Sequence, residues 1–204
     1  MLKNKFSKGV IFSCIAAIFW GLPQPLFFNE LNHVETIEVV AHRGFWSFIF
    51  LFLLLILISN ISDFIEIFKS RKRIFILTIT AFLIAGNWAG FIYSVGQERV
   101  QDASMGYFIT PMISIVLGYF FLNEKITKPK FASVCLMSSG ILFLFINLNQ
   151  FPFLIIWIGT SWAIYGLLRK QVNVNPSIGL LYETFIISLI SIPYLVYLLS
   201  LIHI

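Results

Sequence analysis

Apolar residues dominate this chain in long runs that are separated by short polar loops. Each run approaches the ~20 residues of helix needed to cross a hydrocarbon core roughly 30 Å thick. The pattern therefore predicts seven transmembrane helices, at residues 9–28, 36–58, 74–95, 101–122, 131–147, 152–169 and 177–200.

The loops between these runs differ in charge. Lys and Arg gather in alternate loops, at residues 3–8, 69–73, 125–130 and 169–170. The opposite loops hold Arg99 as their only Lys or Arg, beside acidic residues such as Glu35 and Glu98. Because cytoplasmic loops carry the excess of Lys and Arg, the amino terminus is predicted to be cytoplasmic. The expected location is the bacterial plasma (inner) membrane.

Composition agrees with this interpretation. The mean hydropathy is +0.92, and 11% of the residues are charged, against about 25% in an ordinary soluble domain. The net charge of +5 comes from the orienting loops and does not indicate a nucleic-acid partner. Cys14 and Cys135 fall inside predicted spans, so no disulfide framework is expected. The sequence predicts an all-α integral membrane protein.

Two ionisable residues, His42 and Arg43, interrupt the second apolar run. Placing an Arg in the middle of such a segment costs about 2.5–3.5 kcal/mol on insertion scales, unless the side chain faces a protein cavity and finds partners. Arg43 is therefore a candidate functional residue. The alternative is that Arg43 lies near enough to a helix end for its side chain to reach the interface.

A weak internal repeat relates the two ends of the chain. Residues 16–22 align with 161–167, and residues 37–43 align with 177–183. Arg43 and Glu183 then lie at matching depths in matching helices. Transporters are often built from two related halves of opposite orientation. The repeat predicts a first five-helix unit at residues 1–148 and the start of a second at 149–204, so that about seven of ten expected helices are present.

Small residues recur in two of the predicted spans. Thr110, Ser114 and Gly118 follow one another every four residues in the fourth span, and Gly86 and Gly90 form a GxxxG pattern in the third. Such stripes allow another helix to approach closely, so plain packing is one explanation and substrate contact the other. In the fourth span Pro111 is expected to kink the helix, and in the third a buried Asn87 amide would need partners.

Several strings in the chain resemble one family of permeases. They include Trp20-Gly21, Ala41-His42-Arg43, Asn87-Trp88, Gly106-Tyr107-Phe108-Ile109, Tyr165-Gly166-Leu167-Leu168-Arg169-Lys170 and Leu181-Tyr182-Glu183. On these residues the chain resembles the EamA-domain group of the drug/metabolite transporter superfamily, and most of all the RarD (chloramphenicol-sensitive protein) permeases. The resemblance implies ten helices in two inverted halves. It also implies that this chain lacks about three of them, as its apolar end at Leu201 to Ile204 suggests.

A central cavity reached alternately from each side is the mechanism that we predict. Its substrate-binding residues are predicted to be Arg43, His42, Glu183, Tyr107, Trp20 and Asn87. Arg43 would neutralise either a carboxylate on the substrate or Glu183. If transport is proton-coupled, Glu183 is the expected proton carrier, because a buried carboxylate can take up a proton whereas Arg stays charged. Trp162, Tyr165 and Tyr182 would add flat apolar walls, and Trp157 is expected at the membrane interface.

The expected partners are a small-molecule substrate and the lipid bilayer. We consider two other classes of protein, an enzyme and a non-transporting subunit. An enzyme is not expected, because His33, His42 and His203 are scattered and form no catalytic or metal-binding pattern; no metal or cofactor is predicted. A non-transporting fragment or partner subunit, which assembles or forms a homodimer to complete its bundle, is the main alternative to a permease.

Overall fold

The computed structural model describes residues 2–57, 61–146 and 152–202. All the regular structure in these ranges is helical: α1 (Leu2–Gly21), α2 (Pro23–Glu30), α3 (Thr36–Leu57), α4 (Ile61–Ile67), α5 (Arg71–Gly96), α6 (Val100–Leu122), α7 (Lys128–Ile146), α8 (Phe153–Gln171) and α9 (Pro176–Ile202). The predicted span ends at 58 and 147, the predicted repeat boundary at 148–149 and the residues His203 and Ile204 lie outside these ranges.

Six membrane-spanning candidates, rather than the predicted seven, qualify by length and hydropathy within the described ranges. The predicted span 152–169 folds as α8, but α8 is not among the six. Its last turn carries Arg169 and Lys170, and its middle contains Thr160 and Ser161, which lower its apolar character. The count of seven is therefore not confirmed, and the inverted repeat with its unit boundaries stays a prediction.

Two local features differ from the predicted spans. The first span is two consecutive helices, because Pro23 begins α2 directly after Leu22, and proline removes a backbone donor and restricts the residue before it. The short helix α4 precedes α5 and was not expected. Beyond α4, Ser70 caps α5 by accepting a hydrogen bond from the backbone N–H of Arg73 at 3.4 Å.

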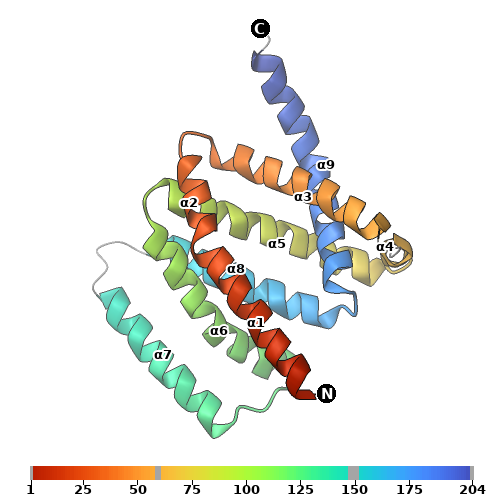
Figure 1. Cartoon of the computed structure of the whole chain (residues 1–204). Coiled ribbons are helices and arrows are strands. Elements are labelled where there is room, and N and C mark those ends of the chain that lie inside the picture. Colours follow the sequence, from red (N-terminus) through yellow and green to blue (C-terminus); the bar gives the residue numbers. More distant parts are fainter. Residues whose placement is uncertain (1, 58–60, 147–151, 203–204) are drawn as a thin grey trace.

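Helices α5, α8 and α9 carry most of the buried core, whereas α1 and α7 lie at the periphery (Figure 1). Half of the most apolar part of α5 is buried, but none of that of α1 and α7. The carboxyl-terminal half of α9 extends beyond the other helices. Helix α6 runs unbroken through Pro111.

Small residues allow two pairs of helices, α6 with α8 and α3 with α9, to approach closely. A Cβ atom on Gly159 of α8 would lie 2.7 Å from the carbonyl oxygen of Gly106 on α6, and Thr110 donates to the Gly159 carbonyl at 3.4 Å. Helices α3 and α9 cross at Gly44, where any Cβ would collide with the Ile187 side chain. The packing explanation of the stripe is thus confirmed at Thr110.

Trp157 occupies the groove formed by the GxxxG pattern of α5. Its indole N–H donates to the Gly86 carbonyl at 2.9 Å, and a Cβ on Gly86 would lie 2.8 Å from the indole ring. A Cβ on Gly90 would lie 3.0 Å from the same ring. Although Trp157 is partly exposed, it therefore joins α8 to α5 as well as facing outward.

Candidate functional site

Glu183 of α9 is a fully buried carboxylate, held by side chains from two other helices, α5 and α8. On α5, Thr80 donates its hydroxyl hydrogen to Oε1 of Glu183 at 2.7 Å. On α8, Tyr165 donates to Oε2 at 3.1 Å, and Nε of Arg169 lies 3.6 Å from Oε1. Tyr165 and Arg169 are four residues apart and so share one face of α8. The result is a carboxylate that accepts two hydrogen bonds and has a cation beside it.

Arg169 was predicted as one of the loop cations that orient the chain and was named in the string 165–170 that resembles the permeases, but it was not among the predicted site residues. In the structure its side chain is 13% exposed and turns inward to Glu183, with Nη2 donating to the Pro176 carbonyl at 3.2 Å. The guanidinium lies in the space that a side chain on Gly179 would fill. The signal in the sequence was the spacing of Tyr165 and Arg169, together with a glycine in the first turn of α9.

Asn87 is fully buried and all of its hydrogen-bonding groups face partners in the core. Its amide nitrogen donates to the Ile158 carbonyl at 2.9 Å and to the Ser161 hydroxyl at 3.0 Å. Its amide oxygen accepts from the Tyr107 hydroxyl at 3.0 Å. Asn87 thus ties α5 to both α6 and α8, and it places the Tyr107 ring.

Four aromatic rings from α1, α6 and α8 form a continuous group, which we call the aromatic cluster: Trp20, Tyr107, Trp162 and Tyr165. The Trp20 and Tyr107 centroids are 6.1 Å apart with the rings nearly perpendicular, and Tyr165 stacks on Trp162 at 5.0 Å. Since the Tyr165 hydroxyl also donates to Glu183, the aromatic cluster reaches the buried carboxylate. Tyr182 lies apart from the cluster, buried and within 3.1 Å of the Thr78 hydroxyl.

Arg43 packs against aromatic rings rather than against Glu183. Its guanidinium carbon lies 4.1 Å from the centroid of a Trp88 ring and 5.6 Å from that of Phe28, and Nη1 is buried with no hydrogen-bond partner. No ion pair within the described ranges includes Arg43. Arg43 was predicted to neutralise either a substrate carboxylate or Glu183. In this structure Glu183 pairs with Arg169 instead.

The structure therefore brings together most of the predicted site residues, in two linked groups. Phe28 contacts Phe91 at 6.1 Å, and Phe91 contacts Tyr107 at 6.1 Å, so rings connect Arg43 to the aromatic cluster. Glu183 joins through Tyr165. His42, by contrast, is exposed on the surface of α3. Thr80 and Phe28 belong to these groups but were not predicted, because hydroxyl and aromatic residues are common throughout the chain. Trp88 was named only in the Asn87-Trp88 string and was not predicted to bind substrate.

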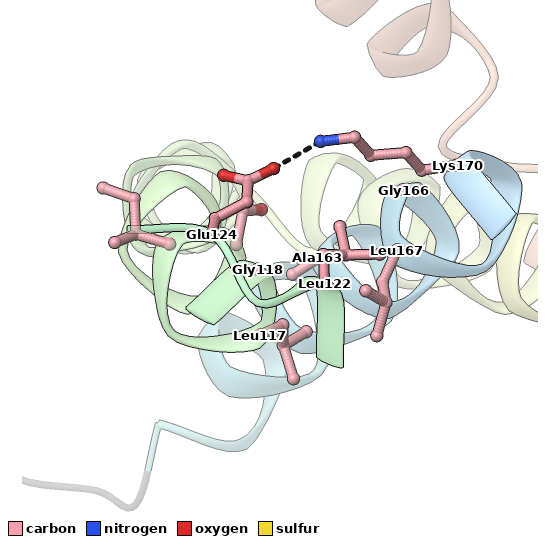
Figure 2. Close-up of a pocket in the computed structure, with 10 residues that line it drawn as sticks. Leu117, Gly118, Leu122, Glu124, Ala163, Gly166, Leu167 and Lys170 are labelled. Carbon is pink, nitrogen blue, oxygen red and sulfur yellow. Dashed lines mark hydrogen bonds and ion pairs between the residues drawn. The ribbon is translucent and has the colours of Figure 1, made fainter. Parts of the chain in front are cut away.

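A separate cavity of about 290 Å³ opens between the carboxyl-terminal halves of α6 and α8 (Figure 2). Its walls include Leu117, Leu122 and Leu167, and an ion pair between Glu124 and Lys170 lies across its rim. Lys130 lies 3.8 Å from the other oxygen of Glu124. The hydrogen bond from Lys170, with the charges of Lys170 and Lys130, holds the pKa of Glu124 below its ordinary value.

Comparison with known proteins defines the class. Residues 7–146 match the EamA-like transporter family, so this chain belongs to that family, and it is a multi-pass bacterial membrane protein. The relatives include Protein RarD of Escherichia coli, 34% identical over 87% of this chain and 60% of that protein. An uncharacterized transporter of Vibrio cholerae is 32% identical over 94% of this chain and 63% of that protein.

A third relative, the uncharacterized transporter YojE of Bacillus subtilis, is 31% identical over 93% of this chain and 64% of that protein. The chain thus spans about three fifths of the length of these curated relatives. No solved structure matches it.

Proposed function

We propose that this protein is a permease of the bacterial inner membrane that moves a small metabolite or drug-like solute by alternating access. The observation that carries the proposal is the polar group around Glu183, which is buried among apolar helices. Polar and ionisable side chains in a membrane interior are unfavourable unless they are paired, and they commonly mark substrate or ion pathways. Membership of a transporter family also supports a role in transport.

The aromatic cluster supplies a surface for the solute. Its rings present flat apolar faces beside polar groups, with the Asn87–Tyr107 hydrogen bond at one side and Glu183 at the other. Pockets for small molecules commonly combine apolar walls with a few placed polar groups. The predicted site residues Arg43, Glu183, Tyr107, Trp20 and Asn87 all belong to this region or connect to it.

Proton coupling is the form of energy input that we propose for Glu183. In this structure the carboxylate accepts hydrogen bonds from Thr80 and Tyr165 and lies beside Arg169, an arrangement suited to its ionised form. Protonation would remove the charge that attracts Arg169 and so weaken the link between α8 and α9. A proton taken up at one side would then favour a different packing of these two helices.

A cytoplasmic amino terminus also belongs to the proposal. Two of the Lys- and Arg-rich loops meet in space, because Lys130 of α7 and Lys170 of α8 both pair with Glu124. Their meeting supports the alternation of basic and non-basic loops from which the orientation was predicted.

The test is uptake into proteoliposomes that contain the full chain, with an imposed pH gradient and a panel of radiolabelled amino acids, short carboxylates and chloramphenicol. At least one solute should accumulate, and accumulation should collapse in Arg43→Ala and in Glu183→Gln. Arg71→Gln, an exposed cation at the start of α5, should retain the wild-type rate. Wild-type rates in both site variants would refute the proposal. Stable assembly without flux of any solute would favour the partner-subunit alternative.

A further inference from the structure

The charges in the membrane interior do not balance. Glu183 compensates Arg169, but within the described ranges no carboxylate lies within ion-pair distance of Arg43. Glu38 is on the same helix, but five residues of helix place it about 140° around the axis from Arg43. One positive charge is therefore left over in this part of the protein.

The surroundings of Arg43 accept its charge only in part. Trp88 and Phe28 face the guanidinium with their rings, which attract a cation but accept no directed hydrogen bond equal to that of a carboxylate. A guanidinium has five N–H donors, and Nη1 is buried with no acceptor. Nη1 of Arg169 is also without a hydrogen-bond partner, but that guanidinium has Glu183 as its counterion.

Arg43 and Glu183 both lie near the crossing of α3 and α9. Arg43 precedes Gly44, where α3 and α9 cross against Ile187, and Glu183 is one turn before Ile187 on α9. Ser188 donates to the Gly44 carbonyl at 3.4 Å in the same crossing. A ligand at Arg43 would therefore lie beside the α3–α9 contact and, through Phe28 and Phe91, beside the aromatic cluster.

We infer that the solute is a small organic monoanion, whose carboxylate pairs with Arg43 and whose flat or apolar part lies on the aromatic cluster. This inference rests on the proposed permease function and names the substrate class of that site. A single carboxylate balances the one uncompensated charge, and its two oxygens match the fork of guanidinium donors. Arg43 is then a binding residue, while Arg169 keeps Glu183 in place.

Binding measured without transport tests this directly. The probes are 4-nitrobenzoate and its neutral amide, 4-nitrobenzamide, titrated into the purified full chain in zwitterionic-lipid nanodiscs, with quenching of tryptophan fluorescence as the readout. The acid should bind at least tenfold more tightly than the amide. Arg43→Gln should remove the difference, and Arg71→Gln, which loses the same charge at an exposed position, should retain it. Equal binding of acid and amide to the wild type would overturn the inference.

Thermal stability separates a ligand-binding role from a structural one. Arg43→Gln removes a partly buried guanidinium that has no carboxylate partner, so its melting temperature without ligand should equal or exceed that of the wild type. Addition of 4-nitrobenzoate should raise the melting temperature of the wild type only. The inference would be overturned if Arg43→Gln lost much of its stability and Arg43→Lys bound the acid and the amide with equal affinity. In the expected case Arg43→Lys keeps a reduced preference for the acid.

Two further arms distinguish other sources of the anion. Stabilisation by phosphatidylglycerol in the wild type but not in Arg43→Gln, with no competition from 4-nitrobenzoate, would assign Arg43 to a lipid headgroup. Tighter binding of 4-nitrophenyl phosphate than of the acid would replace the carboxylate with a phosphate. Acid-selective binding without solute flux would refute only the permease, whereas flux with no acid selectivity would refute only this inference.

Discussion

Arg169 and Lys170 are neighbours on α8, and each pairs with a glutamate, yet the two pairs differ in almost every other respect. Glu183 is completely buried, and its pair with Arg169 lies among three helices. The Glu124 side chain is 39% exposed and that of Lys170 is 62% exposed. The buried carboxylate has two hydroxyl donors besides its cation, whereas the exposed one pairs with two lysines. One helix turn thus presents one cation to the core and the next to the surface.

The difference shows why an ion pair cannot be judged by its charges alone. Exposed pairs contribute little, because water and salt screen them and two long side chains must be ordered. Buried pairs lose much of their attraction to the cost of removing both ions from water, but breaking one leaves an uncompensated charge. We therefore expect changes near Arg169 to have large effects and the same changes at Lys170 to have small ones.

The largest effect is expected from Arg169→Ala, which leaves the buried Glu183 carboxylate without its cation. Removal of one partner from a buried pair costs about 3–5 kcal/mol. The free energy of unfolding, measured by SDS titration of the purified protein in mixed micelles, should fall by that amount.

The double variant Arg169→Ala/Glu183→Gln is the control for that measurement. With the carboxylate neutral, no unpaired ion stays in the core, so the double variant should be more stable than Arg169→Ala alone. Additive losses would show that the two side chains do not act as a pair.

A smaller loss is expected from Tyr165→Phe. The change removes one hydrogen bond to the Glu183 carboxylate but keeps the ring that stacks on Trp162. A hydrogen bond to a charged group contributes about 1.5–3 kcal/mol, and the same titration should record a loss in that range. Tyr119→Phe, at an exposed position of α6, should leave stability unchanged. Equal losses in both variants would mean that the hydroxyl on Glu183 is not what stabilises the site.

Gly179→Ala acts on the buried pair from its other side. The new methyl group would occupy the space of the Arg169 guanidinium and push it away from Glu183. Overpacking typically costs about 1–3 kcal/mol, offset here by the better helix propensity of alanine. Gly166→Ala, where a Cβ meets nothing within 4 Å, is the matched control and should be neutral or stabilising. Wild-type stability in Gly179→Ala would show that the Arg169 side chain can adopt another conformation at no cost in free energy.

Much of the fold could be predicted from hydropathy, because lipid demands long apolar helices wherever the chain crosses it. The helices α3, α5, α6, α7 and α9 all overlap predicted spans. The break at Pro23 and the short α4 were missed, since both are short relative to the length over which hydropathy is averaged. The prediction of α8 as a span was not confirmed, because Arg169 and Lys170 in its last turn and Thr160 and Ser161 in its middle lower its hydropathy.

The site was predictable only in part. Burial of Asn87 and Glu183 follows from polar residues in apolar runs, which need partners inside the bundle. Which partners they find depends on contacts between helices far apart in sequence, such as Thr80 with Glu183. Arg169 shows the difficulty well: a cation at the end of a span serves equally as a loop charge or as an inward-facing partner. Only its contacts with Glu183 and with the Pro176 carbonyl, at the start of α9, decide between the two.

The smallest effect is expected from Lys170→Ala, which breaks the exposed pair. Loss of this hydrogen bond should raise the pKa of Glu124 toward its ordinary value, as followed by ¹³C NMR titration of selectively labelled glutamate, with Glu124→Gln assigning the resonance. Lys69→Ala, another exposed lysine, should leave that resonance unchanged. The melting temperature at pH 7 should be only slightly below that of the wild type, because exposed pairs contribute little.

The pH dependence of this exposed pair has a defined sign. The folded pKa of Glu124 is depressed, so its small contribution to stability is present above the unfolded value of about 4.3. It is lost as pH falls through the folded value, because the protonated carboxyl no longer attracts Lys170. Lys170→Ala and the wild type should therefore differ least at pH values below the folded pKa of Glu124. If Lys170→Ala lost as much free energy of unfolding at pH 7 as Arg169→Ala does, the expected difference between the buried and the exposed pair would be refuted.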